Sequence, residues 1–277
     1  MIVDGATSPW FRVGATNAAP TLPGMSTAQF PAESVPPAHP DDGPRLRIVG
    51  PVLIVLASFT LSLVVFGLLK AFSLSDDSAG TVASFTGSAA ILGFGLLARG
   101  RLPPYERRQI TSPRWALPAA VGVGVGLGIA ARIGIGVVVS VGQSIDPGIC
   151  RKLIELDKNS VPPALWHKLL LATALVVLAP LGEELVFRGL LLRGLVRRMR
   201  FPMAAVISGV VFGLAHLEYW TLWPLLVGIC GFGIAAAFVY RTMGFAANVT
   251  MHAVFNGIAA VFLFSDFGID QSSLTCT

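Results

Sequence analysis

Long runs of apolar residues, separated by short polar breaks, begin at Ile48 and continue almost to the end of the chain. An α-helix needs about 20 such residues to cross the hydrocarbon core of a bilayer. The pattern predicts spans at residues 48–69, 82–98, 116–142, 169–192, 201–217, 222–240 and 245–264. Because the runs are continuous and do not alternate in polarity, the predicted fold class is an all-α, polytopic membrane helix bundle with about seven to eight transmembrane helices.

The chain divides by pattern into four parts. Residues 1–45 are rich in Pro, Ala, Ser, Thr and Gly and lack periodicity, which predicts a disordered, cytoplasmic Pro-rich tail. Residues 46–164 carry the N-terminal transmembrane helices, and residues 165–265 carry a second helical group in which most of the unusual polar residues fall. Residues 266–277 form a C-terminal tail.

Composition supports a chain that is solvated mainly by lipid. Hydrophobic residues make up 54% of the 277 positions and charged residues only 13%, whereas soluble domains carry about 25% charged residues. This excludes an ordinary soluble enzyme and a disordered scaffold. The net charge of +5 is compatible with nucleic-acid binding, but the basic residues lie in short runs between apolar stretches. We therefore expect the lipid bilayer as a partner, and no nucleic acid.

The basic residues also predict an orientation. Arginines cluster in the connections at residues 99–114 and 193–200, while the connection at 73–81 has two aspartates and no base. Because basic loops favour the cytoplasmic side, the N-terminus is predicted to be cytoplasmic. The Ala/Gly/Arg-rich composition is typical of a bacterial chain, so we expect an integral protein of a bacterial cytoplasmic membrane.

Ionisable residues inside apolar runs are costly, and the first group of them is Glu183, Glu184 and Arg188. Glu184 and Arg188 stand four residues apart, so they share a helix face and can pair. Glu183 points about 100° away and lacks that partner, which suits a general base. The alternative is that both glutamates pair structurally with nearby arginines.

Two further groups contain histidine. Phe212 and His216 stand four residues apart near one span end, and His252 and Asn256 stand four apart inside the last run. A lone histidine is often a satisfied structural residue, and Glu218 is a candidate partner for His216. His252 and Asn256 can orient water, bind a metal or stabilise an oxyanion, or simply join two helices by a hydrogen bond.

Taken together, carboxylate, imidazole and carboxamide are the usual groups of metal-assisted peptide hydrolysis. Glu183, His216 and His252 are sufficient to hold Zn²⁺ or another divalent metal with an open position for water. They are equally able to activate water without a tightly held metal, and the sequence leaves both alternatives open.

Other polar or small residues have simpler interpretations. Arg132 lies inside a predicted span and is expected to pair with a carboxylate or with backbone carbonyls, with a functional role as the alternative. The glycine run at 122–136 predicts close helix packing. Asn248 begins a formal glycosylation sequon at membrane depth, and the aromatic cluster at 219–223 predicts an interface belt.

The three motifs resemble the CPBP (CAAX protease and bacteriocin-processing) intramembrane protease family, which contains the CAAX prenyl endopeptidases of the Rce1 kind. The family pattern is Glu-Glu-x-x-x-Arg, then Phe-x-x-x-His, then His-x-x-x-Asn. The chain has this order at residues 183–188, 212–216 and 252–256, and the resemblance covers about residues 165–262. It implies a membrane-embedded (metallo)protease with a catalytic helical core.

The resemblance also implies roles for individual residues. Glu183 would activate the water, and Glu184, held by Arg188, would shape the site. His216 would act in proton transfer or metal binding.

On the last predicted span, His252 and Asn256 would stabilise the oxyanion, with His252 also a metal ligand, and Phe212 would line the cavity. The implied reaction is hydrolysis of a peptide bond in a membrane-associated peptide or protein. An ion or metal transporter and a non-catalytic scaffold of the same fold are the alternatives.

One geometric difficulty accompanies this hypothesis. With straight spans and about 1.5 Å of rise per residue, Glu183 and His252 lie roughly 10 Å from the cytoplasmic edge, and His216 roughly 20 Å from it. Residues that share one water molecule must be closer. Either the helix containing Pro180 bends or the span before His216 starts deeper.

Overall fold

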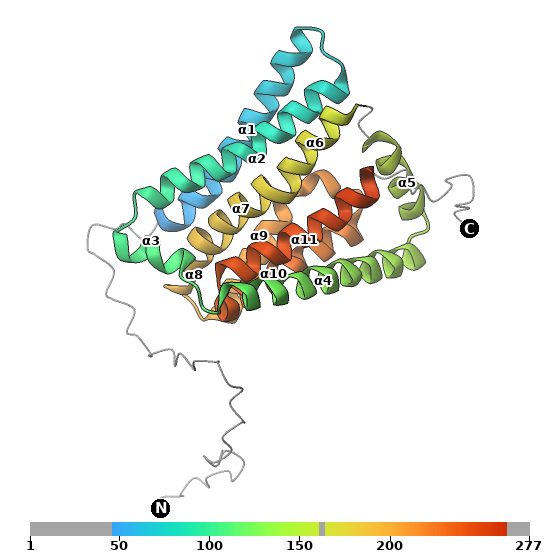
Figure 1. The fold of residues 1–277 in the computed structure, drawn as a ribbon. Coiled ribbons are helices and arrows are strands. Elements are labelled where there is room, and N and C mark those ends of the chain that lie inside the picture. The colour runs from blue at the N-terminus through green and yellow to red at the C-terminus, as the bar shows by residue number, and fades with distance from the viewer. Residues whose placement is uncertain (1–45, 161–163, 265–277) are drawn as a thin grey trace, which may run out of the picture. The chain divides into compact units, whose positions relative to one another are not determined.

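The computed structural model describes residues 46–160 and 164–264, and the regular elements of this part are helices (Figure 1). The prediction of an all-α polytopic bundle is confirmed. The tails predicted at residues 1–45 and 266–277 lie outside the described residues.

Five helices precede the segment that carries the motifs. They are α1 (Leu46–Ala71), α2 (Asp76–Gly100), α3 (Pro104–Thr111), α4 (Leu117–Ile145) and α5 (Gly148–Ser160). The short helices α3 and α5 lie in stretches where the hydrophobic pattern predicted only connections, because neither is long or apolar enough to give a span signal. Ser75 caps α2 by accepting a hydrogen bond from the Ser78 backbone N–H.

The second half begins with one continuous helix that changes its winding. It is composed of α6 (Leu165–Thr173), the π-helical η1 (Ala174–Leu178), α7 (Ala179–Glu183), the π-helical η2 (Glu184–Leu192) and α8 (Arg193–Val196). It is followed by α9 (Phe201–Leu214), the 3₁₀ turn η3 (Leu217–Tyr219), α10 (Trp223–Met243) and α11 (Phe245–Phe264). Gly244, with φ of +91°, ends α10 and turns the chain into α11.

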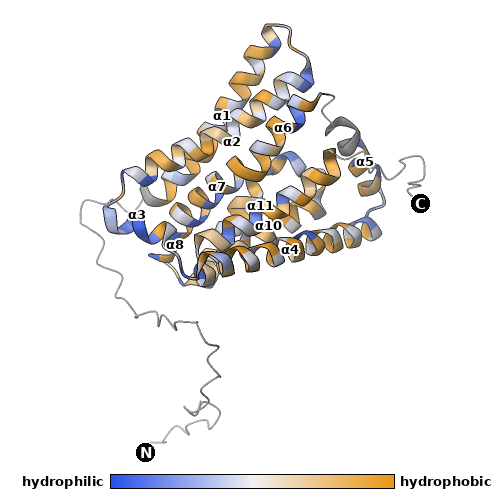
Figure 2. Ribbon diagram, in the orientation of Figure 1, coloured by the Kyte–Doolittle hydropathy of each residue, from blue (hydrophilic) through white to orange (hydrophobic). Residues whose placement is uncertain are grey.

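Six helices of the described residues are long and apolar enough to cross a membrane. They are α1, α2, α4, the continuous helix Leu165–Val196, α10 and α11. The span predicted at 201–217 is the shorter helix α9, which ends at Leu214. The prediction of seven to eight spans had counted α9 as a full crossing. Hydrophobic residues predominate along the long helices (Figure 2), and many large apolar side chains of α1 and α4 are exposed, as lipid-facing surfaces require.

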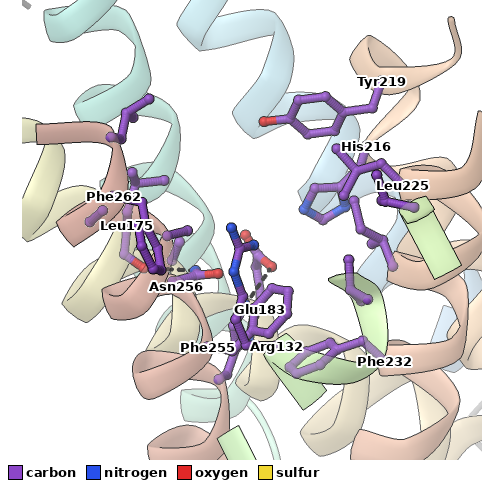
Figure 3. A pocket seen from close by; sticks show the side chains of 18 of the residues that line it. Arg132, Leu175, Glu183, His216, Tyr219, Leu225, Phe232, Phe255, Asn256 and Phe262 are labelled. Atoms are coloured by element: carbon purple, nitrogen blue, oxygen red, sulfur yellow. Dashed lines mark hydrogen bonds and ion pairs between the residues drawn. The ribbon is translucent and has the colours of Figure 1, made fainter. Parts of the chain in front are cut away.

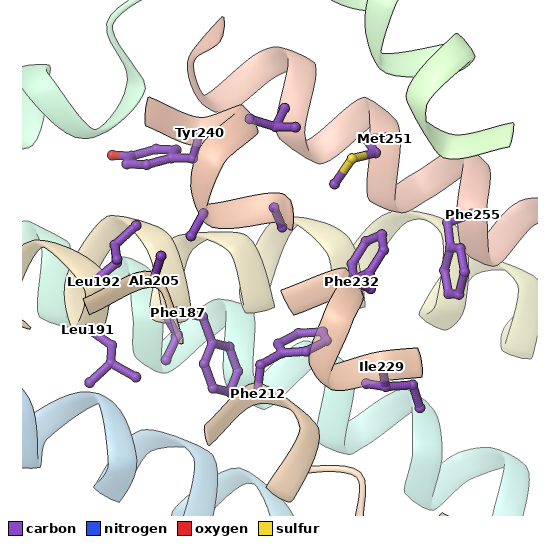
Figure 4. Packing of buried hydrophobic residues seen from close by; sticks show 14 of the residues in the cluster. Phe187, Leu191, Leu192, Ala205, Phe212, Ile229, Phe232, Tyr240, Met251 and Phe255 are labelled. Atoms are coloured by element: carbon purple, nitrogen blue, oxygen red, sulfur yellow. The ribbon is translucent and has the colours of Figure 1, made fainter. Parts of the chain in front are cut away.

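Glycines let α9 and α10 pack with their backbones almost in contact. A Cβ atom on Gly209 would lie 2.6 Å from the backbone nitrogen of Ile234, and one on Gly213 would lie 3.3 Å from the Cα of Cys230. Side chains of the buried cluster fill the space next to these helices (Figure 4). Phe212 contacts Phe187 edge to face, with ring centroids 5.1 Å apart. This packing fixes the end of α9, where His216 follows.

A second glycine seam joins α4 to α11. A Cβ atom on Gly124 would lie 2.7 Å from the carbonyl oxygen of Ala247, and one on Gly128 would lie 2.7 Å from that of Met251. Both substitutions would require the helices to move apart, because backbone atoms cannot swing away as a side chain does. The close packing predicted from the glycine run is thus present at these two positions.

Candidate active site

The paired glutamates lie where the continuous helix meets α2. A Cβ atom on Gly182 would lie 2.7 Å from the backbone nitrogen of Leu92, so only glycine permits this approach. The helix then changes from α to π winding between Glu183 and Glu184. π-Helical winding is rare and often occurs at functional sites. The two carboxylates consequently enter different surroundings although they are adjacent in sequence.

Glu184 is completely buried and receives three hydrogen bonds. Its Oε1 accepts from Arg188 Nη1 at 3.1 Å and from His252 Nδ1 at 2.8 Å. Its Oε2 accepts a short hydrogen bond from Asn248 Nδ2. A carboxylate with donors on both oxygens is held in one orientation, so Glu184 acts as a fixed point between the continuous helix and α11.

Arg188 is also fully buried and completes this network. Its Nη2 donates to the Gly233 carbonyl on α10 at 3.0 Å. Its guanidinium carbon lies 4.6 Å from the centroid of the Phe212 ring, which adds a cation–π contact from α9. The predicted pairing of Glu184 with Arg188 is therefore present, and the pair connects the helices that carry the other two motifs.

Glu183 points elsewhere and keeps 16% of its side chain exposed. Its Oε2 lies 3.8 Å from His252 Nε2, and no described residue donates a hydrogen bond to this oxygen. Because the Glu184 carboxylate only accepts, His252 donates its Nδ1–H to Glu184, and its Nε2 lies on the side of Glu183. The buried Oε2 of Glu183 thus has an unused capacity to accept a proton donor.

His216 follows the end of α9 on the chain segment that leads into η3. Its Nδ1 donates to the Phe212 carbonyl oxygen at 2.9 Å, which leaves Nε2 of the neutral ring as an acceptor. The Phe212 and His216 rings lie 4.9 Å apart between centroids. The partner of His216 is therefore this backbone carbonyl, whereas Glu218 had been the candidate.

Asn256 is positioned by a carbonyl that the helix itself cannot satisfy. In π winding the Leu175 carbonyl would pair with residue 180, but Pro180 has no N–H. Asn256 Nδ2 donates to this carbonyl at 2.8 Å. One N–H of the amide is thereby used, and the second is available to another acceptor.

A cavity of about 600 Å³ brings together the residues of all three motifs. Its wall includes Glu183, Phe212, His216, His252 and Asn256. Figure 3 shows Glu183 extending into the pocket and His216 on another part of its wall. The expected depth mismatch therefore does not arise, because α9 stops at Leu214 and the chain turns back in η3. Glu184 and Arg188 are buried and do not line the cavity.

The sequence interpretation missed Asn248 and Tyr219. Asn248 is fully buried on Glu184 and lies four residues before His252, on the same face of α11, and this spacing was the available signal. Tyr219 was assigned to an interface belt but lines the cavity. Burial raises the pKa of its phenol, and the charges of Glu218 and Glu183 add to the effect.

The surroundings of Arg132 also differ from the sequence-based expectation. The sequence led us to expect a carboxylate or backbone carbonyls as its partner. In the part of the chain that the structure describes, Arg132 forms neither an ion pair nor a hydrogen bond, and its guanidinium carbon lies 5.7 Å from the centroid of the Phe255 ring. It lines the same cavity as Glu183.

Glu183, His216 and His252 do not form a preassembled cluster of metal ligands among the described residues, and metal binding by them stays a prediction. No three His, Cys, Asp or Glu side chains in the described part of the chain gather closely enough to hold an ion. His252 donates Nδ1–H to Glu184, and His216 donates Nδ1–H to a backbone carbonyl, so Nε2 of each ring is not used by these bonds. The arrangement is that of two imidazoles and a carboxylate around a shared pocket.

Residues 165–258 match the family model described as Rce1-like, Type II CAAX prenyl endopeptidase Rce1-like. The matched segment contains all three motifs, so the resemblance drawn from them is confirmed there. No curated protein and no solved structure matches the chain. Together with the six long apolar helices, the match identifies an integral membrane protein.

Proposed function

Because residues 165–258 are Rce1-like, we propose that this chain is an intramembrane endopeptidase in which Glu183 activates a water molecule. The supporting observation is the contrast between the two glutamates. Glu184 is saturated by three donors, while Glu183 lines the cavity and its buried Oε2 has no donor among the described residues. A water molecule in the cavity that donates a hydrogen bond to the exposed part of the Glu183 carboxylate would be positioned for attack.

In the proposed reaction the water oxygen forms a bond to the carbonyl carbon of the substrate, and Glu183 takes the water proton. The C–N bond then breaks, and the proton passes from Glu183 to the leaving amine. His216, whose Nε2 accepts, lies on the same cavity wall and assists in moving protons. The products are a carboxylic acid and an amine, and transfer of one proton between them gives a carboxylate and an ammonium group. Atoms and charges therefore balance without an oxidant or a further reactant.

Negative charge that develops on the carbonyl oxygen requires hydrogen-bond donors. We assign this role to the second N–H of Asn256 and to Nε2 of His252, both on the α11 side of the cavity. The role of His252 requires the doubly protonated ring, because Nδ1 already donates to Glu184. No step of this mechanism is routed through a metal ion, in keeping with the donor geometry of the described residues.

The substrate is a membrane-associated peptide or protein, since the cavity lies among apolar helices. The first probe is a prenylated peptide, following the family description, and the second is an unprenylated peptide carried by a transmembrane helix. Both are presented in proteoliposomes, with cleavage followed by a quenched fluorophore and the cut position by mass spectrometry.

The decisive variant is Glu183→Gln, which removes the base and preserves the shape of the side chain. Turnover should fall by about 10²- to 10⁴-fold, while thermal stability is preserved because Glu183 does not hold the buried network. Glu155→Gln, an exposed carboxylate on α5, is the matched control and should retain full activity. Unchanged cleavage by Glu183→Gln would refute the mechanism and would favour a transporter or scaffold role.

A further inference from the structure

Arg132 is placed at the centre of the membrane-crossing helix α4. It lies fifteen positions after Leu117 and thirteen positions before Ile145, so it is about 20 Å from either end of the helix. A charged residue at this depth is strongly unfavourable unless another group compensates it. Intramembrane arginines therefore generally have a partner or a function.

The position of the side chain is fixed by the glycine seam. Gly124, Gly128 and Arg132 follow at intervals of four residues and share one face of α4. Gly128 on α4 lies against the Met251 carbonyl on α11. One turn further along each helix, Arg132 lies over the ring of Phe255. The same packing that brings α4 to α11 thus delivers the guanidinium to the cavity.

None of the described carboxylates takes up this charge. Glu183 lines the same cavity, yet the two side chains form no ion pair. Figure 3 shows both side chains extending into the pocket. The cation–π contact with Phe255 orients the guanidinium without using its N–H donors.

A guanidinium with free donors in a mainly apolar pocket is a receptor for a planar anion, because it can form two parallel hydrogen bonds to a carboxylate. The cavity of about 600 Å³ has the volume of a small-ligand site and admits a few residues of a peptide.

We propose that Arg132 binds a carboxylate of the substrate peptide and thereby selects and positions the peptide relative to Glu183. The inference rests on the proposed peptidase function, and it adds a specificity-determining residue from α4, outside the matched segment. The carboxylate is supplied either by the peptide C-terminus or by an acidic side chain, and these two sources present the same chemistry to the guanidinium.

The test uses one apolar peptide sequence in three forms that differ only in charge: a C-terminal acid, a C-terminal amide, and an amide with one internal Gln replaced by Glu. Affinity is measured by fluorescence anisotropy with purified full-length Glu183→Gln protein, so that binding is independent of turnover. We expect one or both of the carboxylate-bearing peptides to bind about 10- to 100-fold more tightly than the neutral amide. Which of them does so identifies the source.

Arg132→Met should abolish this preference and leave the affinity for the neutral amide unchanged, and Arg132→Lys should restore part of it because it keeps a point charge. Arg101→Met removes an exposed arginine from the end of α2 and should have no effect. In the active protein, Arg132→Met should reduce kcat/KM for the preferred peptide by the same factor, mainly through KM.

Three results would overturn the proposal: equal affinity for all three peptides, binding of none of them, or a preference that survives Arg132→Met. A loss of thermal stability in Arg132→Met would assign the residue to structure instead. If the protein binds anionic-lipid vesicles through Arg132 and shows no preference among the peptides, the ligand of Arg132 is a lipid phosphate. If the peptides bind selectively but are never cleaved by the wild-type protein, the peptidase function fails while the carboxylate site stands.

Discussion

The buried pair of Glu184 and Arg188 should be the most sensitive point of the fold. Both side chains are fully buried, and each is the counter-charge of the other at 3.1 Å. Removing one partner of such a pair leaves an uncompensated charge and typically costs about 3–5 kcal/mol. We therefore expect Glu184→Gln and Arg188→Met each to destabilise the protein by about this amount.

The double variant should be much less unstable than the sum of the two single variants, because it buries no unpaired charge. A coupling free energy of about 2–3 kcal/mol is expected, near the upper end for residues in contact. Lys70→Met provides the control: Lys70 lies 2.7 Å from Asp76, but both side chains are exposed, at 39% and 82%. An exposed pair is worth about 1 kcal/mol or less in spite of its short distance.

The measurement is reversible unfolding of the purified protein in mixed detergent micelles of increasing SDS content, followed by tryptophan fluorescence. All four proteins and the control are compared at one pH and ionic strength. Additive costs for the two single variants would show that the charges are not coupled. A cost for Arg188→Met no larger than that of Lys70→Met would refute the assignment of this pair as the support of the site.

Other predictions concern the helix seam, the reaction and the effect of pH. Gly128→Val should lower the free energy of unfolding by about 1–3 kcal/mol because it forces α4 from α11, whereas Gly126→Val, with no atom within 4 Å of the added Cβ, should have little effect in the same unfolding assay. His216→Gln should reduce kcat by about 10²-fold or more in the peptide cleavage assay. Exhaustive chelation should leave turnover unchanged, and elemental analysis should find substoichiometric metal; loss of activity that zinc restores would refute this. Because the folded-state pKa of Tyr219 is raised, its contribution to stability is complete below about pH 10 and is lost as pH rises further; Tyr219→Phe should weaken this alkaline loss in thermal melts.

Local spacing allowed part of the site to be predicted from sequence. Glu184 and Arg188 share a face at a separation of four residues, and the structure pairs them, since this relation depends only on helix geometry. The same rule placed His252 and Asn256 together on one face of α11, where both line the cavity. The hydrophobic runs likewise identified the long helices, because span length is set by bilayer thickness.

Relations between distant segments were not predictable in the same way. Asn248 pairs with Glu184, 64 positions away, and its place four residues before His252 indicates only a shared face of α11, not the partner. The depth of His216 depends on the end of α9 at Leu214. The sequence does not indicate this end, because the apolar run continues to Ala215. The partner of Asn256 depends on π winding at Leu175, a consequence of Pro180 and of tertiary packing. Element lengths and windings of this kind are decided by packing and not by pattern.

The wall that α4 contributes to the cavity has a consequence for how such enzymes diversify. The groups assigned to bond cleavage lie on residues 183–256, within the matched segment, whereas Arg132 comes from a helix outside it. Substitution of the residue at position 132 could therefore change the substrate preference and leave the residues assigned to bond cleavage unchanged. Residues 165–258 expressed alone would lack the cavity wall that α4 contributes, so the cavity would be open to the lipid on that side. The three motifs are therefore not sufficient to enclose the site.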